Sequence, residues 1–489
     1  MSAPSVTVAA VDLGATSGRV VVGRVTADRV ELVPVNRFAN RPVQLPSGLH
    51  WDLLHLYASA LDGLAEAVAS GHELAGVGID SWAVDYGLLG GDRLAGLPYC
   101  YRDERTARGV EAVHARVPFA ELYGRTGLQF LPFNTLYQLA AEDAATLASA
   151  RMLLLPDLLG YWLTGTAVTE RTNASSTGLL DPRTREWDSG LIARLGLPAG
   201  LFGPLVDPGY SLGPLRPPVA DAVGAPLEVV TVATHDTASA VLAVPMDPGS
   251  AAYISCGTWG LVGVETGAPI LTDDARAANF TNEGGVDGTT RFLHNVMGLW
   301  ILTETLRTWS VAGRPAELVP LLRAAASEPA PEALVDVDDP WFLPPGDMEA
   351  RLRAWLGERG LPAPTSPAGV VRLIVESLAE AFATAVADAA RLSGVDVRQV
   401  HVVGGGSQNE LLCQLTADRT GLPVVAGPVE ATALGNVLAQ ARAHGVGADL
   451  AGLRSLVAAG FPLRRHQPAS TTTGRSGLGN GSRAGSIQS

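Results

Sequence analysis

The chain carries near its N-terminus the sequence Val11-Asp12-Leu13-Gly14-Ala15-Thr16-Ser17-Gly18-Arg19, set between two apolar and mostly β-branched runs. β-Branched runs favour strands, and the glycines and hydroxyls favour a tight turn between them. Glycine allows close approach to the backbone, and successive backbone amides can hold an anion, so such a turn can bind a phosphate chain. Asp12 could orient the water ligands of Mg²⁺, a cation that prefers oxygen. Taken alone, the same pattern also fits an ordinary turn.

Short strands are expected around and after this turn, at residues 6–13, 19–25 and 30–38. Residues 53–69 have the apolar periodicity of an amphipathic helix, with Asp52 as its N-cap. Residues 74–80 predict a further strand that ends in an acid. Three strands, a helix and a strand, in this order, are typical of the beginning of a ribonuclease-H-like domain.

The pattern begins again in the second half of the chain. Two strands are predicted at residues 251–255 and 261–265, joined by the turn Cys256-Gly257-Thr258-Trp259-Gly260. We therefore predict an α/β fold with two ribonuclease-H-like lobes and a ligand cleft between them. The expected divisions are residues 1–244 for the first lobe, 245–466 for the second and 467–489 for a disordered tail. The tail is rich in Ser, Thr and Gly and has no apolar periodicity.

A second acidic loop follows the apolar run at residues 229–234, which we predict to be a buried strand, where the sequence continues His235-Asp236-Thr237. Open α/β folds place their chemistry at the carboxyl ends of strands. The carboxylate of Asp236 could accept the proton of a substrate hydroxyl, since an ordinary Asp pKa near ~4 leaves it ionised at neutral pH. The alternative is that Asp236 only caps a helix.

Two further segments are candidate binding sites. Asp80-Ser81-Trp82-Ala83-Val84-Asp85 combines carboxylates with an aromatic ring, a pairing that suits sugars, although it also fits a core Trp beside a capping Asp. Gly404-Gly405-Gly406 follows a predicted strand at residues 400–403 and could let an adenosine approach the backbone. The dinucleotide fingerprint G-x-G-x-x-G does not match, because residue 409 is Asn.

The chain contains no lysine, so all 35 basic residues are arginines. A Walker P-loop, a protein-kinase active site and lysine Schiff-base chemistry each need a lysine and are therefore excluded. Codon bias in a GC-rich genome would account for the absence, and the chemical exclusion holds either way. A nucleotide must then be held by backbone amides, hydroxyls, arginine and a metal.

The bulk properties exclude other classes of protein. A net charge of −14 argues against a nucleic-acid-binding face. The three cysteines are far apart and form neither a metal motif nor a disulfide framework, which fits a reducing cytoplasm. We expect no signal peptide and no membrane span.

The order and spacing of these segments resemble the FGGY carbohydrate kinases, which belong to the actin-like, two-lobed ATPase superfamily. The resemblance runs through roughly residues 6–445 and includes two fairly specific segments, Gln129-Phe130-Leu131-Pro132-Phe133-Asn134-Thr135 and residues 235–240. It implies phosphoryl transfer from ATP, with Mg²⁺, to a ketose. Within the family, the resemblance points to L-rhamnulose and its 1-phosphate, in L-rhamnose catabolism.

The resemblance also implies roles for single residues, with Asp236 as the proton acceptor. The residues expected at the nucleotide are Asp12 (through water on the metal), Gly14, Ala15, Thr16, Ser17, Gly18, Arg19, Gly257, Thr258, Gly404, Gly405 and Gly406. Those expected at the sugar are Asp80, Trp82, Ala83, Asp85, His235, Thr237 and Asn295. Two positions depart from the family: Ala83 replaces a frequent Gly beside the sugar, and Thr303 replaces a Gln that contacts the nucleotide in some relatives.

Two alternatives stay open at this point. One is a kinase for another ketose, such as L-fuculose or D-xylulose, and the other is a non-catalytic sensor that keeps the fold. The expected partners are ATP and a ketose, without nucleic acid or membrane, and the expected assembly is a monomer or weak homodimer.

Overall fold

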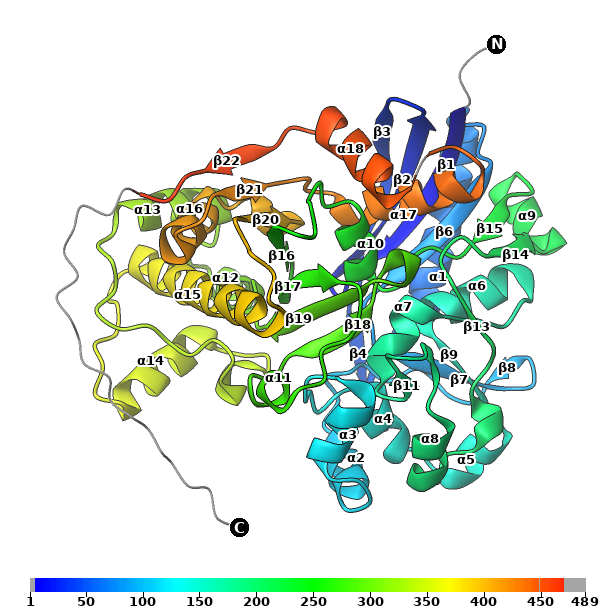
Figure 1. Cartoon of the computed structure of the whole chain (residues 1–489), viewed down its shortest axis with the longest axis horizontal. Helices are drawn as coiled ribbons and strands as arrows, with labels where there is room; N and C mark the ends of the chain where they lie inside the picture. Colours follow the sequence, from blue (N-terminus) through cyan, green and yellow to red (C-terminus); the bar gives the residue numbers. More distant parts are fainter. Residues whose placement is uncertain (1–4, 448, 470–489) are drawn as a thin grey trace.

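The structure, a computed structural model, describes residues 5–447 and 449–469. Its first half is built on a six-stranded sheet (Figure 1) with the order β14-β15-β6-β1-β2-β3. These strands span Ser211–Pro214 (β14), Glu228–Val230 (β15), Gly76–Ser81 (β6), Ser5–Leu13 (β1), Ser17–Thr26 (β2) and Val30–Ala39 (β3). β1 pairs antiparallel with β2 and parallel with β6.

The second half is built on a seven-stranded sheet with the order β18-β19-β17-β16-β20-β21-β22. Its strands span Thr281–Gly284 (β18), Thr290–Val296 (β19), Gly260–Thr266 (β17), Ala251–Cys256 (β16), Gln399–Val403 (β20), Val424–Ala426 (β21) and Arg464–His466 (β22). β16 pairs antiparallel with β17 and parallel with β20, as β1 does with β2 and β6. The repeated arrangement confirms the predicted α/β fold with two ribonuclease-H-like halves.

Helices cover both sheets and form most of the region between β6 and β15 (Figure 1). In the first half they span Leu53–Ala69 (α1), Thr106–His114 (α2), Phe119–Thr126 (α3), Thr135–Ala140 (α4), Ala144–Ser149 (α5), Leu155–Thr164 (α6), Arg171–Ala174 (α7), Ser189–Leu195 (α8), Pro217–Val223 (α9) and Asp236–Leu242 (α10). In the second half they span Asp273–Ala277 (α11), Trp300–Val311 (α12), Leu318–Ser327 (α13), Met348–Glu358 (α14), Pro367–Ser393 (α15), Glu410–Thr420 (α16), Ala431–Ala443 (α17) and Leu450–Gly460 (α18). Short strands add Pro42–Leu45 (β4), Gly48–Trp51 (β5), Tyr86–Gly90 (β7), Arg93–Leu94 (β8) and Arg151–Leu154 (β9). Within the described residues, no helix is long and apolar enough to cross a membrane.

Local sequence explains where the main helices begin. Asp52 caps α1 as predicted, because its side chain accepts a hydrogen bond from the backbone N–H of His55 at 3.2 Å. α15 begins with a proline in its first turn after the cap Ser366, and it ends at Gly394 in the left-handed conformation.

One predicted strand is shorter than expected. The run from Val229 to Thr234 was expected to be a strand throughout, but β15 ends at Val230. Beyond β15, side chains make hydrogen bonds along this segment. The Thr231 hydroxyl donates to the Asp207 carbonyl at 3.0 Å, and the Glu170 carboxylate accepts from the backbone N–H of Thr234 at 3.0 Å. The loop that carries Asp236 is therefore held by side chains together with isolated backbone bonds, such as the one that the Ser81 N–H of β6 donates to the Thr234 carbonyl at 2.9 Å.

Helix α17 crosses from one half of the chain to the other. It lies late in the sequence, yet it packs on β1, β2 and β6 and against α10 (Figure 1). The crossing with α10 is very close, since a Cβ on Gly435 would lie 1.8 Å from the carbonyl oxygen of Ser239. A division of the chain near Val244 stays a prediction, because α17 and α18 are packed on the first sheet.

The predicted tail, residues 467–489, lies outside the described residues from residue 470 onward. Its first residues contact α16: the carbonyl of Gln467 accepts from the Gln414 side chain, and the backbone N–H of Ala469 donates to Asp418, both at 2.8 Å.

Candidate active site

A cavity of about 580 Å³ lies between the two sheets and brings the predicted loops together. Both hairpin turns, the loop at Asp236 and the turn after β20 line it. The residues that line it and were predicted are Asp12, Gly14, Ala15, Thr16, Ser17, Arg19, Trp82, Ala83, His235, Asp236, Thr237, Gly257, Thr258, Asn295, Gly404 and Gly405. Four predicted residues do not line it: Gly18, Asp80, Asp85 and Gly406.

The first hairpin turn joins β1 to β2 and is held from outside. The backbone N–H of Gly14 donates to the Ser17 carbonyl at 2.9 Å, and Asn40 donates to the carbonyls of Gly14 and Thr16 at 2.9 and 3.0 Å. Gly18 lies behind this turn, where a Cβ would come within 2.3 Å of the Phe38 ring. We find the role of Gly18 to be close packing rather than contact with the cavity.

Charge is concentrated beside this turn. Asp12 is buried, and its Oδ2 accepts from the Arg19 guanidinium at 2.9 and 2.5 Å. The same guanidinium also pairs with Glu430, which precedes α17. Glu430 also faces Arg37 at 3.6 Å, so two carboxylates and two arginines lie at this end of the cavity, and Arg19 is the arginine that contacts both carboxylates.

The second hairpin turn joins β16 to β17 and carries no charged side chain. It is closed by the N–H of Gly257, which donates to the Trp259 carbonyl at 2.9 Å, and Trp259 packs on Phe133 at 5.7 Å between ring centroids. The turn after β20 lies against it, since a Cβ on Gly406 would lie 2.2 Å from Cys256 Sγ. Gly406 therefore permits close packing of the two turns, while Gly404 and Gly405 face the cavity.

Asp236 is the first residue of α10, and its side chain is 30% exposed, toward the cavity. Burial raises the pKa of Asp236 above its ordinary value, and the charge of Asp12 raises it further, while His235 and the Thr237 hydrogen bond oppose the rise. Thr237 donates to Asp236 Oδ1 at 3.1 Å. A carboxylate with a raised proton affinity suits a proton acceptor.

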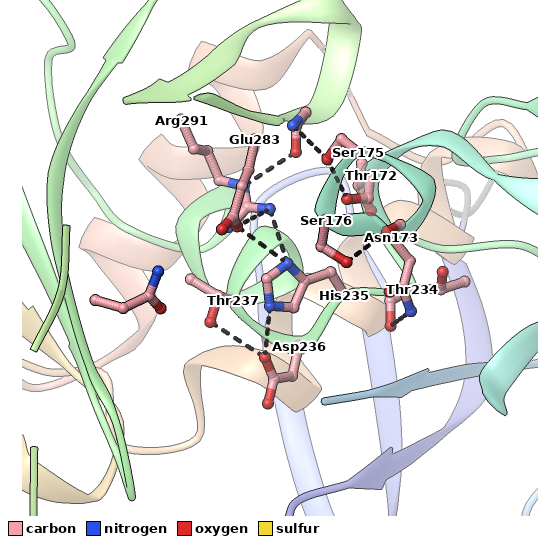
Figure 2. A network of polar contacts seen from close by, with 12 residues as sticks. Thr172, Asn173, Ser175, Ser176, Thr234, His235, Asp236, Thr237, Glu283 and Arg291 are labelled. Carbon is pink, nitrogen blue, oxygen red and sulfur yellow. Dashed lines mark hydrogen bonds and ion pairs between the residues drawn. The ribbon is translucent and has the colours of Figure 1, made fainter. Parts of the chain in front are cut away.

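His235 links Asp236 to a buried ion pair (Figure 2). Arg291 lies 2.9 Å from His235 Nδ1, and a guanidinium can only donate, so Nδ1 accepts. The proton of the neutral imidazole is then on Nε2, which lies 3.4 Å from Asp236 Oδ1. His235 thus presents an N–H toward Asp236.

Glu283 completes this ion pair, with its Oε2 3.1 Å from the Arg291 guanidinium. The same oxygen lies 3.3 Å from His235 Nδ1, farther than Arg291, so we assign the Nδ1 lone pair to the guanidinium. Burial raises the pKa of Glu283, but the charge of Arg291 brings it below its ordinary value.

The prediction that Asp80 and Asp85 contact the substrate is not supported by their placement, because both side chains are buried in the wall of the cavity. Asp85 accepts from the indoles of Trp51 and Trp82 at 2.6 and 2.9 Å and from Gln138 at 2.8 Å. Burial raises the pKa of Asp85 to about 6. Asp80 accepts from Asn436 at 2.6 Å, and burial raises its pKa well above the ordinary value.

Several cavity residues were not predicted as site residues. The polar ones among them are Arg37, Tyr101, Gln129, Asn134, Ser176, Ser255, Thr281, Glu283, Gln408, Glu430 and Thr432. Gln408 closely follows the Gly404–Gly406 turn, and Ser255 ends the predicted strand at residues 251–255. Others, such as Gln129 and Glu430, meet at the cavity because the two halves face each other. The signal that could have found Gln129 was its place in the family-like segment 129–135.

Comparisons with known proteins agree with this geometry. Sequence models of the FGGY family of carbohydrate kinases match residues 7–243 (N-terminal domain) and 252–444 (C-terminal domain). The chain is 42% identical over 465 residues to the rhamnulokinase of Bacteroides thetaiotaomicron, covering 94% of this chain and 95% of the relative. It is 41% identical to the rhamnulokinase of Enterococcus faecalis, covering 94% and 93%. Among solved structures, the gluconate kinase and the ligand-bound xylulose kinase of Lactobacillus acidophilus align with TM-scores of 0.77 and 0.76, at 17% and 16% identity, each covering 95% of this chain and 94% of the other. At these identities the structural likeness concerns the fold alone.

Proposed function

The chain belongs to the FGGY family of carbohydrate kinases, and from this premise we propose that it transfers the γ-phosphoryl group of ATP to L-rhamnulose, giving L-rhamnulose 1-phosphate. The choice of L-rhamnulose rests on one observation: relatives named rhamnulokinase are 41–43% identical to this chain over 94% of its length. We place this reaction in L-rhamnose catabolism.

The proposed chemistry uses Asp236 as the proton acceptor. The sugar hydroxyl oxygen forms a bond to the γ-phosphorus, the bond from that phosphorus to the bridging oxygen breaks, and ADP leaves. Asp236 takes the hydroxyl proton, and its main contribution is to position the nucleophile, as in loose phosphoryl-transfer transition states. The Nε2–H of His235 faces the Asp236 carboxylate and helps to hold it.

We propose that ATP lies along the two hairpin turns and the Gly404–Gly405 backbone. Both turns line one cavity with Asp236, which would bring the γ-phosphate close to the sugar. The Arg19 guanidinium would have to rearrange to reach phosphate, because it now pairs with both Asp12 and Glu430. The expected sugar contacts are Trp82, Ala83, His235, Thr237 and Asn295, all of which line the cavity.

Kinases of this family use ATP, and we propose Mg²⁺ as the divalent cation. The described residues contain no cluster of three or more side chains that could ligate a metal ion. This fits a cation held chiefly by phosphate oxygens and water, with Asp12 behind one of the waters. When bound, the cation neutralises phosphate charge. The three cysteines are all unpaired and buried, which fits our proposal of a cytoplasmic enzyme.

The proposal is tested by comparing kcat/KM for L-rhamnulose, L-fuculose, D-xylulose, L-ribulose and glycerol in a coupled ADP-release assay. A pocket built to hydrogen-bond one hydroxyl discriminates strongly against an epimer that leaves its polar groups unpaired. We expect L-rhamnulose to be the best acceptor. If another acceptor is preferred tenfold, about 1.4 kcal/mol of transition-state preference, the assignment to L-rhamnulose fails while the sugar-kinase class stands.

The Ala83 methyl group is the feature of the pocket most able to change this preference. An Ala83→Gly variant, assayed on the same panel, restores the residue frequent among relatives. If it alters the order of acceptors, the methyl group contributes to the choice of sugar.

A further inference from the structure

Segment 127–134 of the first half of the chain bonds directly to strands β18 and β19 of the second half. The N–H and side-chain Nδ2 of Asn282 donate to the Gly127 carbonyl at 2.9 and 3.0 Å. The N–H of Phe130 donates to the side-chain oxygen of Asn279 at 2.9 Å. The two lobes are therefore joined by hydrogen bonds at the rim of the cavity.

Gln129 makes the contact in this joint that is nearest to the chemistry, because its partner is Asn295. Its Oε1 accepts from both the backbone N–H and the side-chain Nδ2 of Asn295, each at 2.9 Å. Its Nε2 faces the Asn295 carbonyl at 3.4 Å. Gln129 is only 4% exposed, and both residues line the cavity.

These contacts determine which way each amide points. The backbone N–H of Asn295 can only donate, so the Gln129 atom that faces it must be oxygen. The Asn295 side-chain atom that faces this same oxygen must then be nitrogen. Its other atom, Oδ1, receives no hydrogen bond from a described residue, and it remains free to accept one from a ligand in the cavity.

We propose that Gln129 is a positioning residue: it fixes the Asn295 amide so that Oδ1 accepts a hydrogen bond from a hydroxyl of the bound sugar. The inference deepens the proposed function and rests on it. Without Gln129, the amide of Asn295 can rotate and present either its donor or its acceptor, so recognition of that hydroxyl loses its directionality.

The position of the pair adds a second consequence. Gln129 lies between α3 and α4, whereas Asn295 lies on β19 of the other sheet. The acceptor for the sugar is therefore in place only while the lobes are joined at this rim. Sugar recognition and the joining of the two lobes are then coupled through a single pair of amides.

The test compares the near-isosteric variant Gln129→Met with Asn295→Ala and the double variant, using the ketose that the wild-type enzyme prefers. Each single variant should raise the sugar KM about tenfold, as expected for one lost hydrogen bond, with kcat within about threefold and the ATP KM unchanged. Since both changes remove the same interaction, the double variant should be no more than about twofold worse than Asn295→Ala. Effects that multiply to about a hundredfold, or unchanged kinetics in Gln129→Met, would overturn the inference.

A further variant separates positioning from simple bridging of the lobes. Asn282→Ala weakens the same joint without touching Asn295, so it should lower the melting temperature yet leave the sugar KM within about twofold. An equal rise of KM in Asn282→Ala would contradict the role assigned to the Gln129 oxygen. Because the assay uses whichever ketose is preferred, the proposed choice of L-rhamnulose can fail independently of this result.

Discussion

The two hairpin turns of the cavity have the same backbone arrangement and opposite side-chain chemistry. The turn between β1 and β2 is flanked by Asp12 and Arg19, which pair with each other, and Arg19 also pairs with Glu430. The turn between β16 and β17 has no charged residue, and its Trp259 packs on Phe133. The two repeats therefore share the strand pairing, whereas only the first turn is surrounded by charged side chains.

Asp236 lies between these two regions and belongs to neither turn. Asp236→Asn should leave the fold and ATP binding intact and lower kcat by ~10²–10⁴-fold, because an amide cannot accept the proton. The measurement is steady-state kinetics together with ATP titration. Asp247→Asn, at an exposed turn beyond α10, is the matched control and should retain normal turnover. Near-normal turnover in Asp236→Asn would show that Asp236 is not the proton acceptor.

The charged and uncharged turns can be compared directly through Asp12→Asn and Thr258→Val. Removing a charged hydrogen-bonding group typically costs ~1.5–3 kcal/mol, so Asp12→Asn should lower kcat/KM for ATP about tenfold to a hundredfold. It should also change the dependence on divalent cation. Thr258→Val, in the uncharged turn, should cost less than about fivefold, since the backbone provides most of its contacts. Equal losses in the two variants would show that the turns do not differ in role.

The packing of the turn after β20 against the uncharged turn is tested by Gly406→Ala. The new methyl group would lie 2.2 Å from Cys256 Sγ, so we expect a loss of about 1–3 kcal/mol in the free energy of unfolding. Adding Cys256→Ala removes the clashing sulfur but keeps Cβ, which would lie 2.5 Å from the new methyl group, so it should recover only part of this loss. Chemical denaturation of the three variants measures the effect. If the double variant is as unstable as the sum of the two single ones, the contact does not limit packing.

A smaller effect concerns His294, the neighbour of Asn295 on β19. Its two nitrogens face acceptors, the Asn279 carbonyl at 3.0 Å and Asp338 Oδ2 at 3.3 Å. Burial lowers the pKa of His294, but the hydrogen bond and charge of Asp338, helped by Asp388, raise it above the ordinary value. A raised folded-state pKa gives stability that is fully present below the unfolded-state pKa and is lost as pH rises through the folded-state pKa.

The corresponding measurement is the free energy of unfolding of the wild type and His294→Gln between about pH 5 and pH 9. The wild-type advantage should be on the order of 1 kcal/mol below about pH 6 and should shrink at higher pH. Asp338→Asn should weaken the same pH dependence. A wild-type advantage that grows with pH would contradict this account. His114 in the first lobe shows the opposite shift, because burial lowers its pKa.

The smallest effect is expected from the chain end. Deleting residues 470–489 should leave activity and melting temperature almost unchanged, because this Ser-, Thr- and Gly-rich segment has no apolar periodicity with which to bury surface. The cut is placed after Ala469, whose N–H contacts Asp418. A fall of several degrees in the melting temperature would show that the segment stabilises the second lobe.

Regular elements were predictable from the sequence because local patterns determine them. The three N-terminal strands, the helix capped by Asp52 and the repeated hairpin follow from β-branched runs, apolar periodicity and turn residues. The strand expected through Thr234 ended at Val230, because Glu170, far away in the sequence, bonds the later backbone. Local patterns carry no information on such partners.

The site was predictable only where a loop carries its own signal. Asp12, Asp236 and the glycine turns stand at the ends of apolar runs, and the structure brings them to one cavity. Asp80 and Asp85 stand in equivalent places, yet Asn436 and Trp51 engage them in the wall. Gln129 lies 166 residues from Asn295 in the sequence, so no spacing rule relates them.

Helix α17 has a consequence for how the chain can be made. Val8 and Ala10 of β1 are buried in one cluster with Leu434 and Val437 of α17. The first lobe is thus completed by a helix translated more than 400 residues after its first strand. A fragment that stops near Val244 would leave that apolar face in water, so we expect it to aggregate or to require its missing partner. On the ribosome, the first lobe cannot finish folding until almost the entire chain has been synthesised.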